Sequence, residues 1–258
     1  MAGSLFDLSG RKALVTGGNS GLGLAYARGM ARQGADVVIW GRNAQKNAAA
    51  KAELERFGGK VHTQLVDVSD EAAVIAGFAE ALDWAGRMDC VVQNAGFNNP
   101  VPSIAQMPTS AWRAQLDVAL DGGFYTVREA ARHMMSRAEA GERGGSIVMC
   151  GSGAVHQGIP GVGHYAAAKA GMAAVMKCLA VELAPHGIRV NMIAPGYIRT
   201  GLEVAPGLEE MLAERTPIGR VGNPEDLEGA IAYIMSDAAR HHTGDILNID
   251  GGWLASYM

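Results

Sequence analysis

Short apolar runs rich in β-branched residues alternate along the chain with longer segments whose apolar positions recur at helical spacing. The runs predict strands at 12–16, 36–40, 61–66, 88–94, 146–150, 189–193 and 245–249. The longer segments predict helices near 21–33, 44–57, 70–84, 109–137, 164–184 and 224–236. Runs that are apolar on both faces and separated by helices are typical of a parallel sheet covered on both sides. The pattern therefore predicts the α/β class, with about seven strands in one doubly wound parallel sheet.

Two segments interrupt this alternation. Residues 95–108 and 195–224 are rich in Gly and Pro, and they follow the fourth and sixth predicted strands. Open α/β sheets bind ligands at the carboxyl ends of their strands, and long loops there are usually functional. No linker, repeat or low-complexity tract separates the elements. We therefore expect one domain, 1–258, with a substrate lid at about 195–224.

The composition of the chain excludes some classes of binding partner and indicates a cellular compartment. The net charge of −4 offers no basic surface for nucleic acid or an anionic membrane. Residues 1–12 show no targeting segment, and the apolar stretch at 170–183 is interrupted by charges. Cys90, Cys150 and Cys178 are odd in number and lie in apolar runs, which indicates reduced core thiols of a cytoplasmic protein.

A glycine-rich turn joins the first predicted strand to the first predicted helix. Gly17 permits a tight turn, Gly21 leaves room for a pyrophosphate, and Gly23 lets the helix pack on the strand. Free N–H groups at the helix start then face the phosphates. A plain tight turn is the alternative, but the position of this glycine triplet inside a βαβ unit favours a dinucleotide site.

Tyr165 and Lys169 are four residues apart and therefore share one face of a helix. A free tyrosine titrates near pH ~10 and is a poor proton donor or acceptor at neutrality. A fixed ammonium beside the phenol favours the phenolate. The spacing alone is a weak signal, because two helix residues with separate partners produce it equally well.

Further motifs follow in order along the chain. They are Asp67 within 66–68, Asn94-Ala95-Gly96, Ser152 thirteen residues before Tyr165, the run 195–200, and the tail 248–252. With these motifs and the glycine turn, nearly the whole chain resembles the short-chain dehydrogenase/reductase family. It is similar in particular to members of the 3-oxoacyl-acyl-carrier-protein reductase and gluconate 5-dehydrogenase kinds. The resemblance implies a Rossmann-type fold, a nicotinamide cofactor, and hydride transfer between it and a carbonyl or secondary alcohol.

The resemblance also implies roles for individual residues. Ser152 would hydrogen-bond the reacting oxygen, Tyr165 would act as general acid, and Lys169 would hold the nicotinamide ribose and favour the phenolate. Asp67 would contact adenine, Asn94 with Gly96 the adenosine ribose, and Ile198 with Thr200 the carboxamide. The complete expected cofactor set is Gly17, Asn19, Ser20, Gly21, Leu22, Gly23, Arg42, Asp67, Val68, Asn94, Ala95, Gly96, Tyr165, Lys169, Pro195, Gly196, Ile198 and Thr200. The expected substrate contacts are Phe97, Ala154, His156 and Tyr197.

Ala119 departs from the family pattern. The family usually carries an Asn there, which is thought to hold a water in a proton relay from the lysine to solvent. An alanine methyl cannot do so. Either backbone groups hold the water, or turnover is slower, or catalysis has been lost. Because Ser152, Tyr165 and Lys169 persist, we favour an active enzyme that reduces a ketone, over a catalytically silent cofactor-binding regulatory protein.

The second predicted strand ends at Trp40-Gly41-Arg42. An acidic residue about 20 residues past the glycine turn binds the ribose hydroxyls of NAD, and Gly41 lies where that acid would be. Arg42 can pair with a 2′-phosphate. We therefore predict NADP(H) over NAD(H); an Arg42 stacked on adenine is the alternative.

Other features are weaker signals. His156 and His164 flank the predicted site and could touch substrate, whereas His241 and His242 are expected in a surface turn facing water. No metal site is predicted, because the histidines lack clustered carboxylate or Cys partners.

The helix over 165–184 is apolar nearly all round, so both of its sides should be buried. We therefore predict a homotetramer, in which a partner subunit covers the second side of this helix. In the alternative, the protein is a monomer and its own residues 253–258 cover that side.

Overall fold

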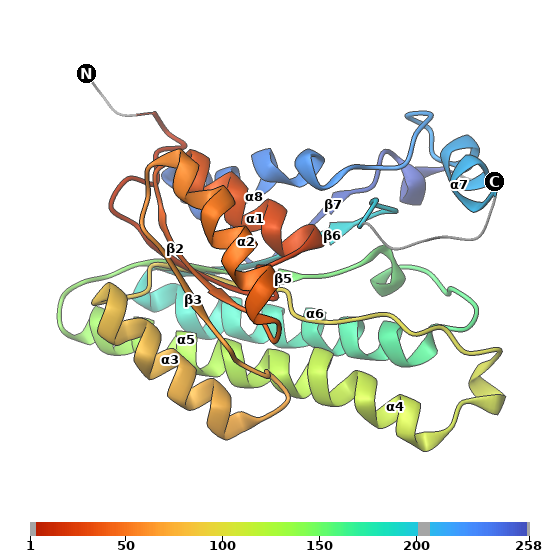
Figure 1. Ribbon diagram of the computed structural model, residues 1–258, viewed down its shortest axis with the longest axis horizontal. Coiled ribbons are helices and arrows are strands. Elements are labelled where there is room, and N and C mark those ends of the chain that lie inside the picture. The colour runs from red at the N-terminus through yellow and green to blue at the C-terminus, as the bar shows by residue number, and fades with distance from the viewer. Residues whose placement is uncertain (1–3, 201–206, 257–258) are drawn as a thin grey trace.

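Seven strands pair in parallel in one sheet in the computed structural model, which describes residues 4–200 and 207–256 (Figure 1). The strands are β1 (Lys12–Thr16), β2 (Asp36–Trp40), β3 (Val61–Gln64), β4 (Cys90–Gln93), β5 (Gly145–Cys150), β6 (Ile188–Pro195) and β7 (Ile246–Ile249). Their order is β3-β2-β1-β4-β5-β6-β7, so the sheet reverses its winding between β1 and β4. This is the Rossmann-type fold, and the predicted fold class is confirmed.

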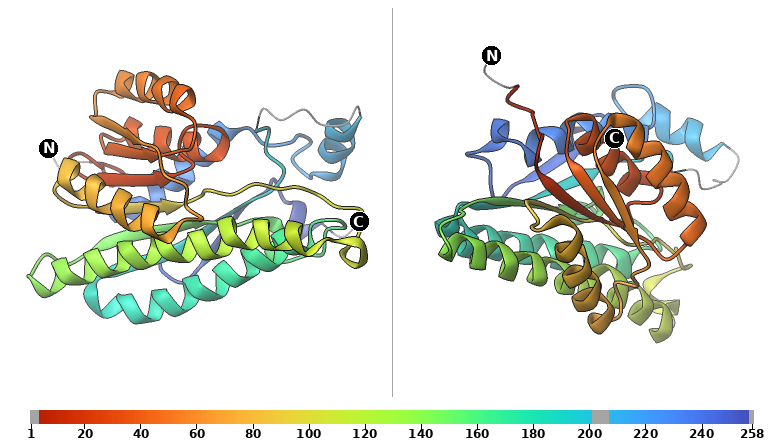
Figure 2. Two further views of the ribbon diagram at one scale, coloured as in Figure 1. Left: turned by 60° about the horizontal axis from the view of Figure 1, so that its bottom comes forward. Right: turned by 60° about the vertical axis from the view of Figure 1, so that its left-hand side comes forward.

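Helices cover both faces of the sheet (Figures 1 and 2). One face carries α1 (Gly21–Arg32), α2 (Ala44–Leu54) and α8 (Glu228–Met235), and the other α3 (Glu71–Ala85), α4 (Thr109–Leu116), α5 (Gly122–Glu139) and α6 (Gly163–Leu183). The segment after β6 carries α7 (Leu208–Arg215). Consecutive strand residues point to opposite faces, so Leu14 enters one apolar cluster while Ala13 and Val15 enter the other. Burial on both faces explains why the strands are continuous apolar runs.

Single helical turns connect the longer elements. The 3₁₀ turns are Glu55–Phe57, Ile104–Gln106, Gly153–Val155, Ala184–His186, Pro224–Leu227, Asp237–Ala239 and Trp253–Ala255. The helix predicted at 109–137 is interrupted by a π turn at Asp117–Asp121, which separates α4 from α5. Gly122 follows at once, and a Cβ there would lie 2.6 Å from the Val68 carbonyl oxygen. The helix therefore passes close to the backbone at Val68 because it carries no side chain at this point.

The cysteines differ from the prediction in one case. All three are free thiols, and Cys90 and Cys150 are buried, but Cys178 is exposed on α6. The prediction of a core thiol is wrong for Cys178, because an apolar helix does not reveal which of its sides meets the sheet. Among the helices of the described residues, none is both long and apolar enough to cross a membrane.

Candidate active site

The glycine turn lies at the point where the sheet reverses its winding. Gly17 and Gly21 have φ values of 63° and 53°, which side chains other than glycine rarely adopt. A Cβ on Gly23 would lie 2.1 Å from the Gly17 carbonyl oxygen, so only glycine fits there. At the start of α1 the Ser20 side chain makes no cap, and the first turn carries no acidic residue. The first N–H groups are therefore available to an anion.

Asn94 connects the end of β4 to this turn. Its Nδ2 donates to the Thr16 carbonyl oxygen at 2.9 Å and to that of Gly17 at 3.4 Å. The Thr16 hydroxyl accepts from the backbone N–H groups of Asn94 and Ala95, both at 2.9 Å. Thr16 is fully buried, and sequence reasoning assigned it no role. These bonds cross-link the glycine turn to Asn94-Ala95-Gly96, so the two segments form one side of the candidate cofactor site.

The segment after β6 lies on the other side of this candidate site. Thr200 Cβ lies 3.8 Å from the position a Cβ on Gly21 would take. Ile198 forms a parallel bridge with Gly222, and Gly196 donates to the Ile249 carbonyl oxygen at 2.9 Å. Pro195 ends β6. The predicted cofactor residues on both sides of the glycine turn are thus brought together.

The residues that follow β2 form the outer end of this candidate site. Asn19 Nδ2 donates to Asn47 Oδ1 at 2.7 Å, and a Cβ on Gly41 would lie 2.2 Å from Asn19 Nδ2. The Asn19 amide therefore occupies the space that a side chain at 41 would need. Asn47 is buried and was not predicted from the sequence. Its Oδ1 holds the Asn19 amide, and its Nδ2 donates to the Gly41 carbonyl oxygen.

Arg42 and Asp67 face each other at this end, with 3.5 Å between Nη1 and Oδ2. Burial raises the pKa of the Asp67 carboxyl, but hydrogen bonds from Ser69 and the charge of Arg42 outweigh it and lower that pKa below its usual value. Asp67 is therefore ionised at neutral pH. Val68, the next expected contact, has its side chain in the core.

Lys169 lies beside Tyr165 at the carboxyl end of β5, and Ser152 follows that strand by two residues. The Lys169 ammonium donates to the Cys150 carbonyl oxygen at 2.5 Å and lies 5.7 Å from the centroid of the Tyr165 ring. Its Nζ is also 4.0 Å from where a Cβ on Gly96 would lie, and the side chain is 3% exposed. Ser152 begins a 3₁₀ turn, and its hydroxyl oxygen accepts from the Ala154 N–H at 3.2 Å.

Tyr26 lies beneath this group and was not anticipated from the sequence. It is fully buried, and its hydroxyl is 3.7 Å from Cys150 Sγ. Burial, together with the neighbouring Cys150, raises the pKa of Tyr26 well above its usual value, so its phenol stays protonated. Tyr26 therefore supports Cys150, which in turn anchors Lys169.

The expected substrate contacts differ in exposure. Phe97 and Tyr197 are 38% and 37% exposed, and His156 is exposed, whereas the side chain of Ala154 is buried. Tyr197 packs edge-on against Trp253, with ring centroids 4.8 Å apart. A cavity of about 250 Å³ lies beside it; its lining includes Ile198, Ile218 and Asp250. Residues 201–206 of the expected lid lie outside the described residues.

His164 lies inside the protein. It is fully buried, and its Nε2 lies 3.1 Å from the Asn99 carbonyl oxygen. The helix turns its side chain under the loop that follows β4, and whether it could touch substrate stays a prediction.

Comparison with known proteins agrees with this geometry. Residues 17–254 match the family model described as enoyl-(acyl carrier protein) reductase. Gluconate 5-dehydrogenase of Gluconobacter oxydans is 35% identical over 252 residues, 96% of each chain. The 3-oxoacyl-acyl-carrier-protein reductase FabG of Chlamydia muridarum is 37% identical over 250 residues, 95% of this chain and 98% of the relative. The crystal structure of a gluconate 5-dehydrogenase from Burkholderia cenocepacia, in complex with NADP and tartrate, superposes with a TM-score of 0.90 at 33% identity and covers 98% of both chains.

The chain belongs to the short-chain dehydrogenase/reductase family. It is therefore a nicotinamide-dependent oxidoreductase of that family. The glycine cradle, with its uncapped helix start and space that a Cβ would fill, fits the pyrophosphate of such a cofactor.

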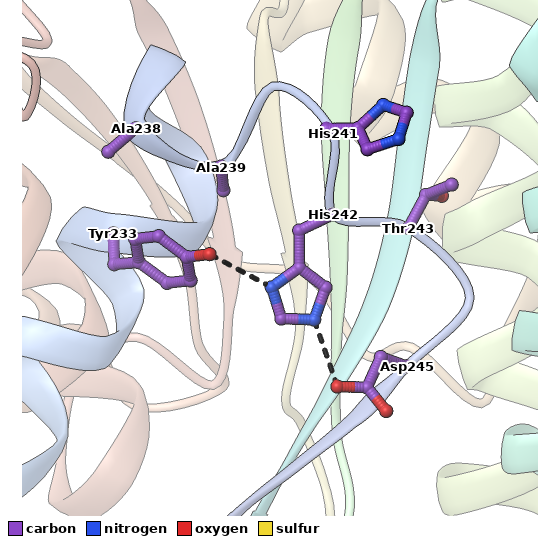
Figure 3. A pocket seen from close by; sticks show the side chains of 7 residues that line it. All are labelled: Tyr233, Ala238, Ala239, His241, His242, Thr243 and Asp245. Atoms are coloured by element: carbon purple, nitrogen blue, oxygen red, sulfur yellow. Dashed lines mark hydrogen bonds and ion pairs between the residues drawn. The ribbon is translucent and has the colours of Figure 1, made fainter.

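This short-chain dehydrogenase/reductase has a larger cavity, of about 380 Å³, at the amino end of β7 (Figure 3). The glycine turn lies at the other end of the strands, where β1 ends. At the cavity the Tyr233 hydroxyl is 3.2 Å from His242 Nδ1, and His242 Nε2 is 2.9 Å from Asp245 Oδ2. The expectation that His241 and His242 both face water is wrong for His242, because these two partners hold its ring against the protein. None of the site residues predicted from the sequence lines this cavity.

Proposed function

We propose that this protein reduces a ketone to a secondary alcohol with NADPH, and that Ser152, Tyr165 and Lys169 carry the reaction. The observation that carries the proposal is the position of the Lys169 ammonium, held by the Cys150 carbonyl beside the Tyr165 ring. The nicotinamide, when bound, supplies the hydride. Tyr165 then gives its proton to the carbonyl oxygen as charge develops there.

The hydrogen bonds in the structure favour these assignments. The Ser152 oxygen already accepts from Ala154, so its own hydroxyl proton is free to be donated to the substrate oxygen. Lys169 uses one of its three donors on Cys150, which leaves others for the nicotinamide ribose. Its positive charge lies beside the Tyr165 ring and attracts the negative charge that the ring oxygen carries after proton transfer.

We assign the cofactor cleft to the residues predicted for it. Gly17 to Gly23 would bind the pyrophosphate, Asp67 adenine, Asn94 and Gly96 the adenosine ribose, and Ile198 and Thr200 the carboxamide. A preference for NADP(H) is supported by Arg42, which is 69% exposed at the outer end and free to turn toward a 2′-phosphate. It is also supported by Asn19, which excludes an acidic side chain at Gly41.

The expected lining of the substrate site suits three classes of substrate. Phe97, Ala154, His156 and Tyr197 would line its site, within a single domain 1–258 whose segment 195–224 acts as a lid. This mixture of apolar and polar groups suits 3-oxoacyl thioesters, sugar acids and cyclic ketones, and two relatives carry names from the first two classes.

A panel of those three classes with NADPH and with NADH tests the function. We expect the absorbance of the reduced nicotinamide at 340 nm to fall with at least one class, faster with NADPH. Tight cofactor binding without hydride transfer to any of them would favour the alternative, a catalytically silent regulatory protein. Ala119 is the observation that supports this alternative.

We also infer a homotetramer. The exposed residues of α6 are apolar except at two positions, Lys177 and Glu182, and comprise Ala170, Ala174, Lys177, Cys178, Val181 and Glu182. Val181 is 77% exposed, and Phe124 of the adjacent α5 is 43% exposed. Trp253, offered as an intramolecular cover, packs instead on Tyr197 and under Arg215. A second copy of the chain is therefore the simplest cover. The free thiols suit the reducing cytoplasm.

A further inference from the structure

Two glutamine amides are buried without complete hydrogen bonding on the α6 side of the sheet. Gln115 in α4 is fully buried, and neither its Nε2 nor its Oε1 has a partner among the described residues. Gln93, the last residue of β4, is 1% exposed, and its Oε1 is likewise unpartnered among the described residues. Buried polar atoms are nearly always hydrogen-bonded, and ordered water is the usual partner when protein groups are not.

Both amides lie along the buried side of the helical segment that carries Ala119. Gln115, Ala119 and Gly123 are buried on successive turns of the helical segment that runs through the π turn. A Cβ on Gly123 would lie 3.1 Å from Gln93 Nε2 and 3.0 Å from Met172 Sδ. The Gln93 amide therefore lies between α5 and α6, on the face of the sheet that Gln115 and Ala119 also meet.

The same region adjoins Lys169. Met172 is three residues after Lys169 and so lies on the same side of α6. Gln93 pairs with Met149 in the sheet, next to the Cys150 whose carbonyl accepts from Lys169. An ammonium has three donors, and in a side chain that is 3% exposed each of them needs a partner. Ala119 has no polar side-chain atom to offer.

We propose that Gln115, together with Gln93, holds internal water beside Lys169 and so positions the path by which Tyr165 is reprotonated. The proposal rests on the proposed function. In each reduction Tyr165 gives one proton to the substrate oxygen and becomes a phenolate. One proton from solvent then passes along the held water to the phenolate, so a single proton is consumed with each hydride. Gln115 is a positioning residue in this account and supplies a polar group in place of the one that Ala119 lacks.

Replacing Gln115 with Leu separates this role from a structural one. We expect Gln115→Leu to lower kcat on the order of tenfold, part of what general acid catalysis supplies, with cofactor affinity unchanged. The solvent deuterium isotope effect on kcat should increase, because proton delivery becomes limiting. The Tm of the cofactor-free protein should stay nearly the same, because an apolar side chain of similar size replaces the amide together with the water that it holds.

Gln64 offers a matched control. It is also a buried glutamine, but its Oε1 accepts from Trp40 at 2.6 Å and its Nε2 donates to the Gly77 carbonyl oxygen at 3.0 Å. Gln64→Leu should lower the Tm and leave the isotope effect unchanged. In the double variant Gln115→Leu/Ala119→Asn, a polar side chain returns one turn away, and kcat and the isotope effect should move back toward the original values.

Two results would overturn the proposal. One is Gln115→Leu with an unchanged kcat and isotope effect. The other is a crystal structure of the cofactor-free protein without ordered water between Gln93 and Gln115, which decides the matter even if a variant fails to fold. Failure of the proposed function looks different, because the unaltered protein would then transfer no hydride, or Tyr165→Phe would retain activity, whatever Gln115→Leu does.

Discussion

Lys169 donates to the carbonyl oxygen of Cys150 at 2.5 Å, and this bond anchors its ammonium at the carboxyl end of β5. The two residues are 19 positions apart, and β5 and α6 bring them together. Because the lysine is anchored by backbone, its charge is held beside the Tyr165 ring. This preorganisation is what a proton donor at this position requires.

Tyr165→Phe should abolish turnover, by a factor on the order of 10² to 10⁴, and leave cofactor affinity nearly unchanged. The ring is kept and the transferable proton is lost. Lys169→Ala should reduce both affinity and rate, since it serves the ribose and the phenol. Cofactor titration by fluorescence and steady-state kinetics measure the two effects. Substantial activity in Tyr165→Phe would refute the assigned mechanism.

Arg42→Ala should weaken NADPH binding about tenfold or more, as expected for one charge-assisted hydrogen bond, and barely change NADH binding. The exposed Arg240, before β7 at the other edge of the sheet, is the control, and Arg240→Ala should change neither. Equal loss for both cofactors would mean that Arg42 stacks on adenine instead. A lower specificity constant for NADPH than for NADH in the unaltered protein would refute the preference itself.

Gly23→Ala should distort the glycine turn, because its Cβ would lie 2.1 Å from the Gly17 carbonyl oxygen and 2.5 Å from Asn94 Nδ2. We expect a loss of about 1–3 kcal/mol in the free energy of unfolding, as for other overpacked sites, and weaker cofactor binding. Gly229→Ala in α8 is the control: nothing lies within 4 Å of its Cβ position, so it should be neutral or stabilising. Chemical denaturation of both variants makes the comparison, and equal stability would contradict the steric argument.

His133 should make stability depend on pH below neutrality. Partial burial, and then the charge of Arg137, lower the pKa of His133 from its ordinary value of 6.5, and its Nε2 accepts from the Met88 N–H at 3.1 Å. The folded state therefore favours neutral imidazole. This contribution is complete above pH 6.5 and is lost as the pH falls through the lowered folded-state pKa. His133→Gln keeps an acceptor that does not titrate.

Thermal unfolding between pH 7 and pH 5 tests this, and we expect a smaller fall in Tm for His133→Gln than for the unaltered protein. His186, half-buried at the end of a 3₁₀ turn, is a control position, and His186→Gln should leave the fall in Tm unchanged. Identical falls for the His133 variant and the parent would mean that His133 does not contribute.

Light scattering at micromolar concentration should give a mass four times that of the 26.9 kDa chain. Val181→Glu should reduce it, because a carboxylate would be buried in the α6 interface. Ile75→Glu is the control, since Ile75 is 45% exposed on α3, away from that interface. The mass of a single chain for the unaltered protein would rule the oligomer out.

Local spacing was enough to predict the strands, the helices and the glycine turn, whereas the pairing of Tyr165 with Lys169 also needed the other motifs along the chain. Period 2 or 3.6 assigns residues to a face of a strand or helix, and a glycine with positive φ is dictated by its own backbone. Such properties depend on neighbours within a few positions, so they can be predicted from the sequence alone.

Contacts between distant segments were decided only by the tertiary structure. Asn94 meets Thr16 across 78 positions, and Asn19 reaches Gly41 because Asn47 holds it there. Cys178 faces outward although its helix is apolar all round. Gln115 is fully buried in a helix that is otherwise mostly exposed. Each outcome depends on how whole elements pack together, and periodicity carries no information about which neighbour a given face will meet.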